Sequence, residues 1–347
     1  MLDIVTTTPK AIENSKANGG DIWSTHHDIG DFSLYERFAN FKKIPIEALT
    51  SKPDLTPSGD VIREIVTPQR MENFSALQNV ATGNVIDVTP FKGSYTFKPH
   101  LDAMKEQAEI VERSPLPTGN VEVIDRIFDE GVRVHRTIYF HEMTHALGHT
   151  KNGKRDMVRC RLDIFNSVDK SWSLQVFSGA FRDLCRNTLV FGGEKAYHTK
   201  QKHTGTMSNE AANEKAVLGL EMWANQSEQM KLWQQAGMTN RQFADVIKPF
   251  CRKNTKGAEL EESISINERK FNYLLERFAE EKRELGETMW AAYNALTHWA
   301  THLPDARDRG RAEKKRFDRN KEVRQIITGP DWLYYEGLAS RKQLAVQ

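Results

Sequence analysis

The segment Thr137–His149, TIYFHEMTHALGH, constrains the fold most, because its meaning depends on whether it forms a helix or a strand. On a helix, the pattern His-Glu-x-x-His puts two imidazoles one turn apart and is a signature of zinc peptidases. His141 and His145 would then bind zinc, and Glu142 would be the general base. In a strand, two residues four positions apart lie on one face but about 13 Å from each other, too far for one zinc ion.

The flanking residues favour the strand. The run Arg133–Phe140 is rich in β-branched and aromatic residues, and Val134, Ile138 and Phe140 alternate with residues of the other face. A Gly/Asn/Lys-rich turn follows at 148–156, and then a second alternating run at 157–165. We therefore predict a β-hairpin with no metal or other cofactor. The alternative is a zinc metallopeptidase in which Glu214 or Glu221, on a later predicted helix, would be the third ligand beside His141 and His145.

The chain of 347 residues is long enough for one large domain or two ordinary ones. Residues 1–118 are weakly patterned, with recurring prolines, and predict an irregular domain or a partly extended arm, with helices near 33–41 and 101–112. Residues 119–335 predict the main domain, and residues 336–347 a C-terminal tail.

The main domain is expected to begin with a helix at 120–130, where Val121, Ile124, Ile127 and Phe128 form an apolar stripe that Gly131 ends. The two hairpin strands follow, and the run 172–191 predicts either a long strand or a strand with a short helix after Gly179. After a basic loop at 192–206, helices are expected at 213–235, 240–248 and 261–302. We predict an α+β fold: an antiparallel three-stranded β-sheet core followed by long helices on one face, in the order β-β-β-α.

The composition is typical of a soluble protein of a reducing compartment. The three cysteines, Cys160, Cys185 and Cys251, have no paired or metal-type spacing. No apolar run has the length of a membrane span, and the polar N-terminus does not resemble a signal peptide. We therefore expect a cytoplasmic protein with no membrane partner.

Positive charge is concentrated in one part of the chain. Residues 131–207 hold 13 Lys/Arg against 6 Asp/Glu, a net charge of +7, although the whole chain has only +2. Phosphate binding needs cations along a groove, and holding bases needs aromatic faces. The candidate nucleic-acid-binding residues are Arg133, Arg136, Lys151, Lys154, Arg155, Arg159, Arg161, Trp172, Arg182, Arg186, Lys200 and Lys202.

Several spaced polar residues at 162–193 and beyond resemble the phage- and plasmid-associated family called domain of unknown function 932. The likeness extends over roughly 120–335. It rests on Asn166, Ser167, Asp169, Gly179, Phe181, Arg182, Cys185, Asn187, Leu189, His203, Thr204 and Gly205, and on Thr288, Asn294, Thr297 and His302 of a later helix. Family members have a basic, strand-like segment before the Asn-Ser turn but no His-Glu-x-x-His, so this chain departs from them there. The family has no established activity, and the resemblance implies a phage or plasmid context.

The order of a basic sheet and then long helices is similar in outline to that of the single-strand annealing proteins of phage recombination. This is an analogy of fold only. Together with the local charge, it predicts a protein that binds single-stranded nucleic acid without sequence preference, as a homo-oligomeric ring or filament that anneals strands. Two alternatives stay open: the zinc metallopeptidase described above, and a counter-defence protein that binds a host protein.

Overall fold

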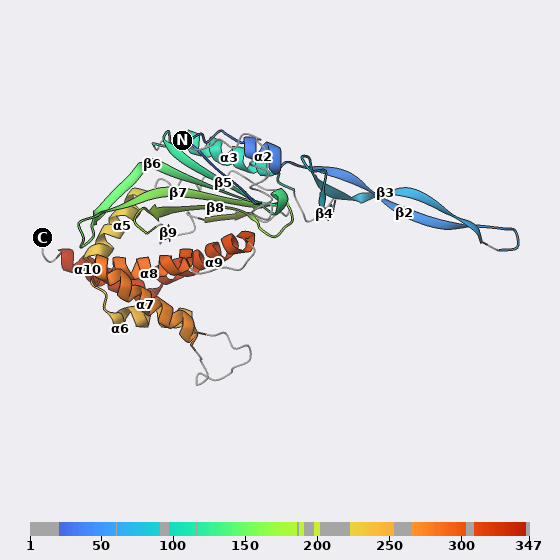
Figure 1. Ribbon diagram of the computed structural model, residues 1–347. Helices are drawn as coiled ribbons and strands as arrows, with labels where there is room; N and C mark the ends of the chain where they lie inside the picture. The colour runs from blue at the N-terminus through green and yellow to red at the C-terminus, as the bar shows by residue number, and fades with distance from the viewer. Residues whose placement is uncertain are drawn as a thin grey trace.

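The computed structural model describes residues 21–59, 61–90, 97–114, 117–185, 187–190, 198–201, 223–252, 266–302 and 309–344. Over these residues, helices combine with two antiparallel sheets, which confirms the α+β class (Figure 1). The main sheet has seven strands, so the expected core of three strands was too small. Its order is β1-β5-β6-β7-β8-β10, with β9 also paired to β8.

The centre of the main sheet is an antiparallel meander of long strands. The strands of this sheet are β1 (Ile22–His26), β5 (Val121–Phe128), β6 (Arg133–His149), β7 (Arg155–Ser167), β8 (Leu174–Arg182), β9 (Asn187–Val190) and β10 (His198–Gln201). The turn between β6 and β7 is closed by a hydrogen bond from the Thr150 amide to the Lys154 carbonyl, and Gly153 adopts a φ of 75° there. The predicted hairpin is confirmed, and the His-Glu-x-x-His segment lies in strand β6.

The helix expected at 120–130 is wrong, because β5 occupies this segment. Val121, Val123 and Ile127 are buried at alternate positions, and β5 pairs with both β1 and β6. Gly131 ends a short 3-10 helix, η1 (Asp129–Gly131), with a φ of 96°. A Cβ atom at this position would lie 2.3 Å from the carbonyl oxygen of Phe38, so both the conformation and the space require glycine.

Helices cover both sides of this sheet. Figure 1 shows α2 (Ser33–Phe38) and α3 (His100–Arg113) on one side, with the C-terminal helices on the other. The C-terminal set is α5 (Trp223–Gln235), α6 (Asn240–Ile247), η3 (Lys248–Cys251), α7 (Glu268–Leu285), α8 (Met289–His302), α9 (Arg309–Ile327) and α10 (Pro330–Leu344). Among the described residues, no helix is both long and apolar enough to cross a membrane.

Most of the predicted helices are confirmed. Those at 33–41, 101–112 and 240–248 correspond to α2, α3 and α6, and the segment 261–302 contains α7 and α8. Thr239 caps α6 in a reciprocal capping box with Gln242. The helix expected at 213–235 includes α5, and its earlier part lies outside the described residues. Helix α10 runs to Leu344, through most of the segment 336–347.

Helix α8 is the centre of the helical layer. Eleven of its residues are buried, and α8 contacts α5, α7, α9 and strand β9. Trp233 of α5 packs edge-on against Trp332 of α10, with 5.3 Å between the ring centroids, and lies 4.8 Å from the ring of Tyr293. This aromatic group joins α5, α8 and α10 within the helical layer.

A second sheet projects from the body as an arm. It has the order β2-β3-β4 and contains β2 (Phe41–Leu55), β3 (Val61–Asn79) and β4 (Val85–Pro90). Figure 1 shows β2 and β3 as a long twisted ribbon that extends away from the main sheet. At its base, the Asn79 side chain donates hydrogen bonds to the carbonyls of Phe38 and Glu130. The arm is therefore anchored on α2 and η1.

Candidate functional site

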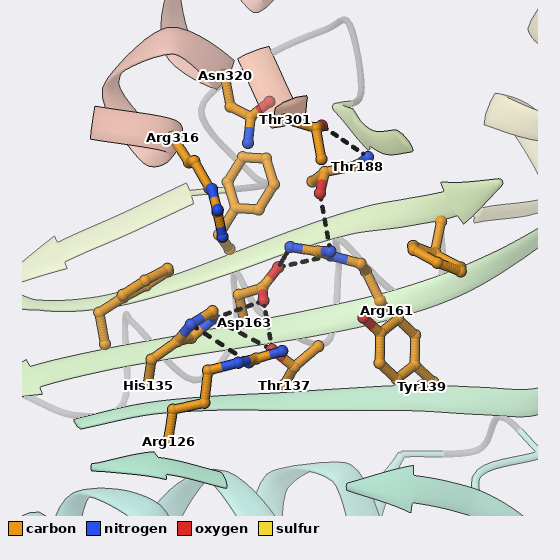
Figure 2. A pocket seen from close by; sticks show the side chains of 13 residues that line it. Arg126, His135, Thr137, Tyr139, Arg161, Asp163, Thr188, Thr301, Arg316 and Asn320 are labelled. Atoms are coloured by element: carbon orange, nitrogen blue, oxygen red, sulfur yellow. Dashed lines mark hydrogen bonds and ion pairs between the residues drawn. The ribbon is translucent and has the colours of Figure 1, made fainter. Parts of the chain in front are cut away.

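A cavity of about 160 Å³ lies between one face of the main sheet and helices α8 and α9. The register pairs His135 with Phe165, Thr137 with Asp163, and Tyr139 with Arg161. Since alternate residues of a strand share a face, these side chains meet on the same side of β6 and β7. The lining comprises Arg126, His135, Thr137, Tyr139, Arg161, Asp163, Phe165, Phe177, Phe181, Thr188, Thr301, Arg316 and Asn320 (Figure 2).

Asp163 is the polar centre of the cavity floor and is almost completely buried. It accepts hydrogen bonds from the Arg161 guanidinium, from His135 Nε2 at 2.8 Å and from Thr137 Oγ1 at 2.9 Å. Burial alone would raise the pKa of this carboxyl group. The charge of Arg161 and the hydrogen bond from His135 outweigh burial and hold its pKa well below the ordinary value. Asp163 is therefore an anion that neutralises Arg161.

Arg126 of β5 differs from Arg161 in its partners. Its Nη1 donates to Thr137 Oγ1 at 2.9 Å and lies 3.5 Å from His135 Nδ1. A guanidinium can only donate, so this contact fits the tautomer in which Nδ1 accepts and His135 Nε2–H donates a hydrogen bond to Asp163. Among the described residues, no carboxylate forms an ion pair with Arg126. It is a half-buried cation held by neutral groups.

Arg126 also belongs to a row of flat groups across the sheet. Its guanidinium lies 5.3 Å from the ring centroid of Trp23, which faces it from strand β1 and is 51% exposed. On the other side, the His135 ring stacks on Phe165 with centroids 4.0 Å apart and an interplanar angle of 12°. The row begins at the buried core and ends at an aromatic ring in solvent.

The opposite wall comes from the helices and from β9. Figure 2 shows Arg316 and Asn320 of α9 reaching toward the cavity over the sheet residues. Thr188 of β9 accepts from Arg161 Nη1 at 3.1 Å, and its amide donates to Thr301 Oγ1 of α8 at 3.0 Å. Residues from the sheet and from the helical layer thus hold one another in place around the cavity.

Three of the candidate nucleic-acid-binding residues lie in the interior. Arg136 is fully buried beside Asp125 and over the ring of Phe32, on the α2 side of the sheet. Arg182 is buried in a bidentate pair with Asp156. Trp172 packs edge-on against Phe128 and Phe165. Burial keeps all three from contact with a ligand in solvent, which corrects their assignment.

The remaining candidates are dispersed. Arg161 lies in the cavity, Arg133 pairs with Asp129, and Arg159 pairs with Asp183. Lys151, Lys154 and Arg155 are exposed at the end of the β6–β7 hairpin, which contacts α7 through the Lys151 amide. Arg186 and Lys202, like Glu214 and Glu221 of the zinc alternative, lie outside the described residues, as does the side chain of Lys200 in β10.

The His-Glu-x-x-His segment lies in strand β6, whereas the zinc-peptidase alternative requires a helix there. His141 Nε2 lies 4.0 Å from Glu122 Oε2, whereas the ring of His145 lies 5.2 Å from that of Trp223. The two imidazoles thus have separate surroundings. Burial lowers the pKa of both histidines. The charge of Arg159 lowers the pKa of His141 further, and the charge of Lys231 does the same for His145. Within the described residues, no three His, Cys, Asp or Glu side chains are grouped so that they could hold a metal ion.

Five polar residues of the family resemblance form a network between the β8–β9 turn and α8: Arg182, Asn187, Asn294, Thr297 and His302. Arg182 Nη1 donates to Asn294 Oδ1 at 3.1 Å, and Asn187 Nδ2 donates to Thr297 Oγ1 at 3.4 Å. His302 Nε2 lies 3.0 Å from Asn187 Oδ1. Cys185 lies beside this network, and burial raises the pKa of its thiol, which favours the neutral form. These residues dock α8 on the sheet.

The structure thus defines an α+β protein in which a basic, aromatic-lined cavity separates an antiparallel sheet from a helical layer. A family model described as Domain of unknown function (DUF932) matches residues 91–323, more than half of the chain, and the chain belongs to this family. The resemblance inferred from the motif residues is confirmed. No curated protein and no solved structure matches the chain significantly.

Sequence reasoning missed Arg126, Trp23 and Arg316. Arg126 and Trp23 lie in segments expected to be a helix and a weakly patterned region, so no pattern joined them. Arg316 comes from a basic segment about 190 residues further along the chain from Arg126. With β5 assigned as a strand, the alternation of Arg126 with buried Asp125 and Ile127 would have placed Arg126 on the same face as His135.

Proposed function

We propose that this protein binds single-stranded nucleic acid without sequence preference, with backbone phosphate held at Arg126 and a base stacked on Trp23. The single observation that carries the proposal is the half-buried Arg126 guanidinium, which neutral partners orient and no described carboxylate neutralises. Arginine is well suited to phosphate because its planar fork can donate two parallel hydrogen bonds.

The neighbouring groups support a nucleotide rather than a simple anion. Trp23 exposes half of its surface beside Arg126, and bases stack on aromatic faces irrespective of sequence. Tyr139 and Phe181 add an aromatic pair inside the cavity, with 5.3 Å between centroids. In one nucleotide, the charged phosphate would bind Arg126 and the flat base would stack on Trp23.

The size of the cavity favours a single strand. Its volume of about 160 Å³ is smaller than the roughly 300–1,000 Å³ of sites that enclose small-molecule ligands. It can admit a phosphate group with part of its sugar while the bases remain outside. By the analogy of fold with single-strand annealing proteins that the sequence order suggested, annealing in a phage or plasmid context is part of the proposal.

Titration of a labelled oligonucleotide of about 30 nucleotides, followed by fluorescence anisotropy, tests the phosphate contact. Affinity should fall as salt rises from about 50 to about 300 mM, and Arg126→Ala should reduce the salt slope by about one. Arg113→Ala is the matched control, because this arginine is 81% exposed on α3, on the other side of the sheet. Thermal melting of both variants checks that they are folded. Salt-independent binding, or equal effects of the two variants, would reject the proposal.

An abasic oligonucleotide of the same length separates stacking from charge. Trp23→Ala should weaken binding to the normal strand roughly tenfold, since stacking on one aromatic side chain contributes about 1–3 kcal/mol per base. It should leave affinity for the abasic strand unchanged, whereas Arg126→Ala should weaken both. Tyr334→Ala, a 63% exposed tyrosine on α10, is the control for loss of a surface aromatic ring. Comparison of DNA and RNA strands shows whether the sugar matters.

A further inference from the structure

Within the described residues, the outer part of the β2–β3 arm is a two-stranded ribbon with no further strand paired to it. In the described chain, β4 pairs only with Phe74–Gln78 of β3, near the base of the arm. The pairs from Glu47 with Arg70 outward belong to β2 and β3 alone. An isolated two-stranded ribbon is marginally stable in water, and a third strand or a packed face is needed for stability. The part of the chain that the structure describes therefore provides no layer that would support the outer arm.

Apolar side chains on the arm lie in solvent. Leu49 is 73% exposed and Val66 is 54% exposed, and the arm also exposes Leu55, Val61 and Ile65. Single apolar residues on a surface are common, but a group of them on an extended element marks an interaction site. The ribbon thus offers an apolar surface to a partner.

The charge of the arm points to a protein partner. Residues 41–55 and 61–79 contain five Lys/Arg (42, 43, 52, 63 and 70) and four Asp/Glu (47, 54, 64 and 72), so their net charge is +1. A surface that binds nucleic acid needs a clear excess of cations, because affinity depends on neutralising phosphates. The interspersed acidic residues of the arm oppose such binding.

One face of the ribbon is complementary to itself. Glu47 lies opposite Arg70, and Leu49 lies opposite Pro68 one step further out, so all four side chains share a face. A two-fold axis along the arm, between two ribbons stacked face to face, brings β2 of one copy over β3 of the other. Glu47 of each copy then meets Arg70 of its partner, and Leu49 meets Pro68. This is the self-complementarity that a two-fold interface requires.

We propose that two copies of this chain form a two-fold dimer in which the arms stack through the face formed by Glu47, Leu49, Val66, Pro68 and Arg70. The stacked arms form a four-stranded unit with an apolar centre and an ion pair on each side. This inference is independent of the proposed nucleic-acid binding, because it rests only on the arm, which lies outside the residues that the family model matches.

Charge reversal across the interface tests the dimer. Sedimentation velocity over a range of concentrations gives the dimer dissociation constant of the wild type. Glu47→Arg makes both charged positions of the face basic, and Arg70→Glu makes both acidic, so each variant should dimerise at least roughly tenfold more weakly. An equimolar mixture of the two variants should form a heterodimer, because a basic face then meets an acidic one.

The mixture distinguishes contact between chains from a change within one arm. Each variant has like charges at positions 47 and 70 of its own ribbon. Only pairing with the other variant can bring opposite charges to these positions. Lys52→Glu is the control, because Lys52 lies opposite Ile65 on the other face of the ribbon. It should leave the dissociation constant within about twofold of the wild type. Circular dichroism confirms folding of all variants. A monomeric wild type, or a mixture that associates no better than its components, would overturn the proposal.

Discussion

Whether the charge of an arginine is available to a ligand depends on its carboxylate partner. Arg182 and Arg136 contact Asp156 and Asp125 in the interior, and Arg161 is neutralised by Asp163 on the cavity floor. Buried charges are tolerated when they are paired, and the charges of these three arginines are compensated inside the protein. Arg126 has neutral partners and keeps its charge available to a ligand. The net charge of +7 for residues 131–207 therefore overstates the positive charge that a ligand can contact.

Replacement of Asp163 should be strongly destabilising, because Arg161 would keep its charge without a counter-ion. We expect Asp163→Asn to lower the free energy of unfolding by about 3 kcal/mol near neutral pH. The pKa of Asp163 is lower in the folded protein than in the unfolded chain, where it is about 3.9. Its stabilisation is therefore complete above about pH 5 and is lost progressively as the pH falls below about 4.

Urea denaturation at several pH values measures this effect. The difference in unfolding free energy between the wild type and Asp163→Asn should be constant from about pH 5 to 8 and about 1 kcal/mol smaller at pH 3. Asp169→Asn, in the turn after β7, is the control and should change the free energy by less than about 1 kcal/mol. A difference that does not vary with pH would contradict the charged, hydrogen-bonded state of Asp163.

Periodicity identified some elements and misassigned one. The alternation of Val134, Ile138 and Phe140 correctly predicted β6, because each of these residues faces the core. At 121–128, apolar residues fit both the helical and the alternating pattern. A strand is favoured by four β-branched residues, Val121, Val123, Ile124 and Ile127. The strand forms because this segment pairs with β1 and β6. The Asn, Thr and His residues of the family motif could be identified individually, but their common network depends on docking of α8.

Strand β6 makes a specific prediction for the His-Glu-x-x-His segment. Since His141 and His145 have separate surroundings in a strand, we expect His141→Ala to leave the zinc content of the protein unchanged. Elemental mass spectrometry of protein purified without a metal-affinity tag measures zinc per chain. Glu142→Ala, at the exposed position between the histidines, should likewise have no effect. One zinc per chain that disappears in His141→Ala would show that these imidazoles bind metal.

At the scale of the whole molecule, the arm is the feature that sequence patterns indicated least. A segment that buries little leaves no apolar stripe, and Pro45, Pro53 and Pro68 interrupt the patterns that mark strands. The sequence predicts an irregular domain or a partly extended arm for residues 1–118, and it does not predict the paired strands β2 and β3. This region also contributes β1, with Trp23, to the main sheet. The candidate site and the proposed dimer contact thus both depend on it.

The two proposals together make a prediction about strand annealing. A dimer joined by its arms carries two cavities, so one molecule can hold two strands close together and raise their effective concentration. Annealing of complementary labelled strands, followed by fluorescence energy transfer, should be faster with the wild type than without protein. Glu47→Arg should retain binding to a single strand but lose most of this acceleration, and the equimolar mixture with Arg70→Glu should restore it. If Glu47→Arg anneals strands as fast as the wild type at concentrations where it is monomeric, annealing does not require the arms.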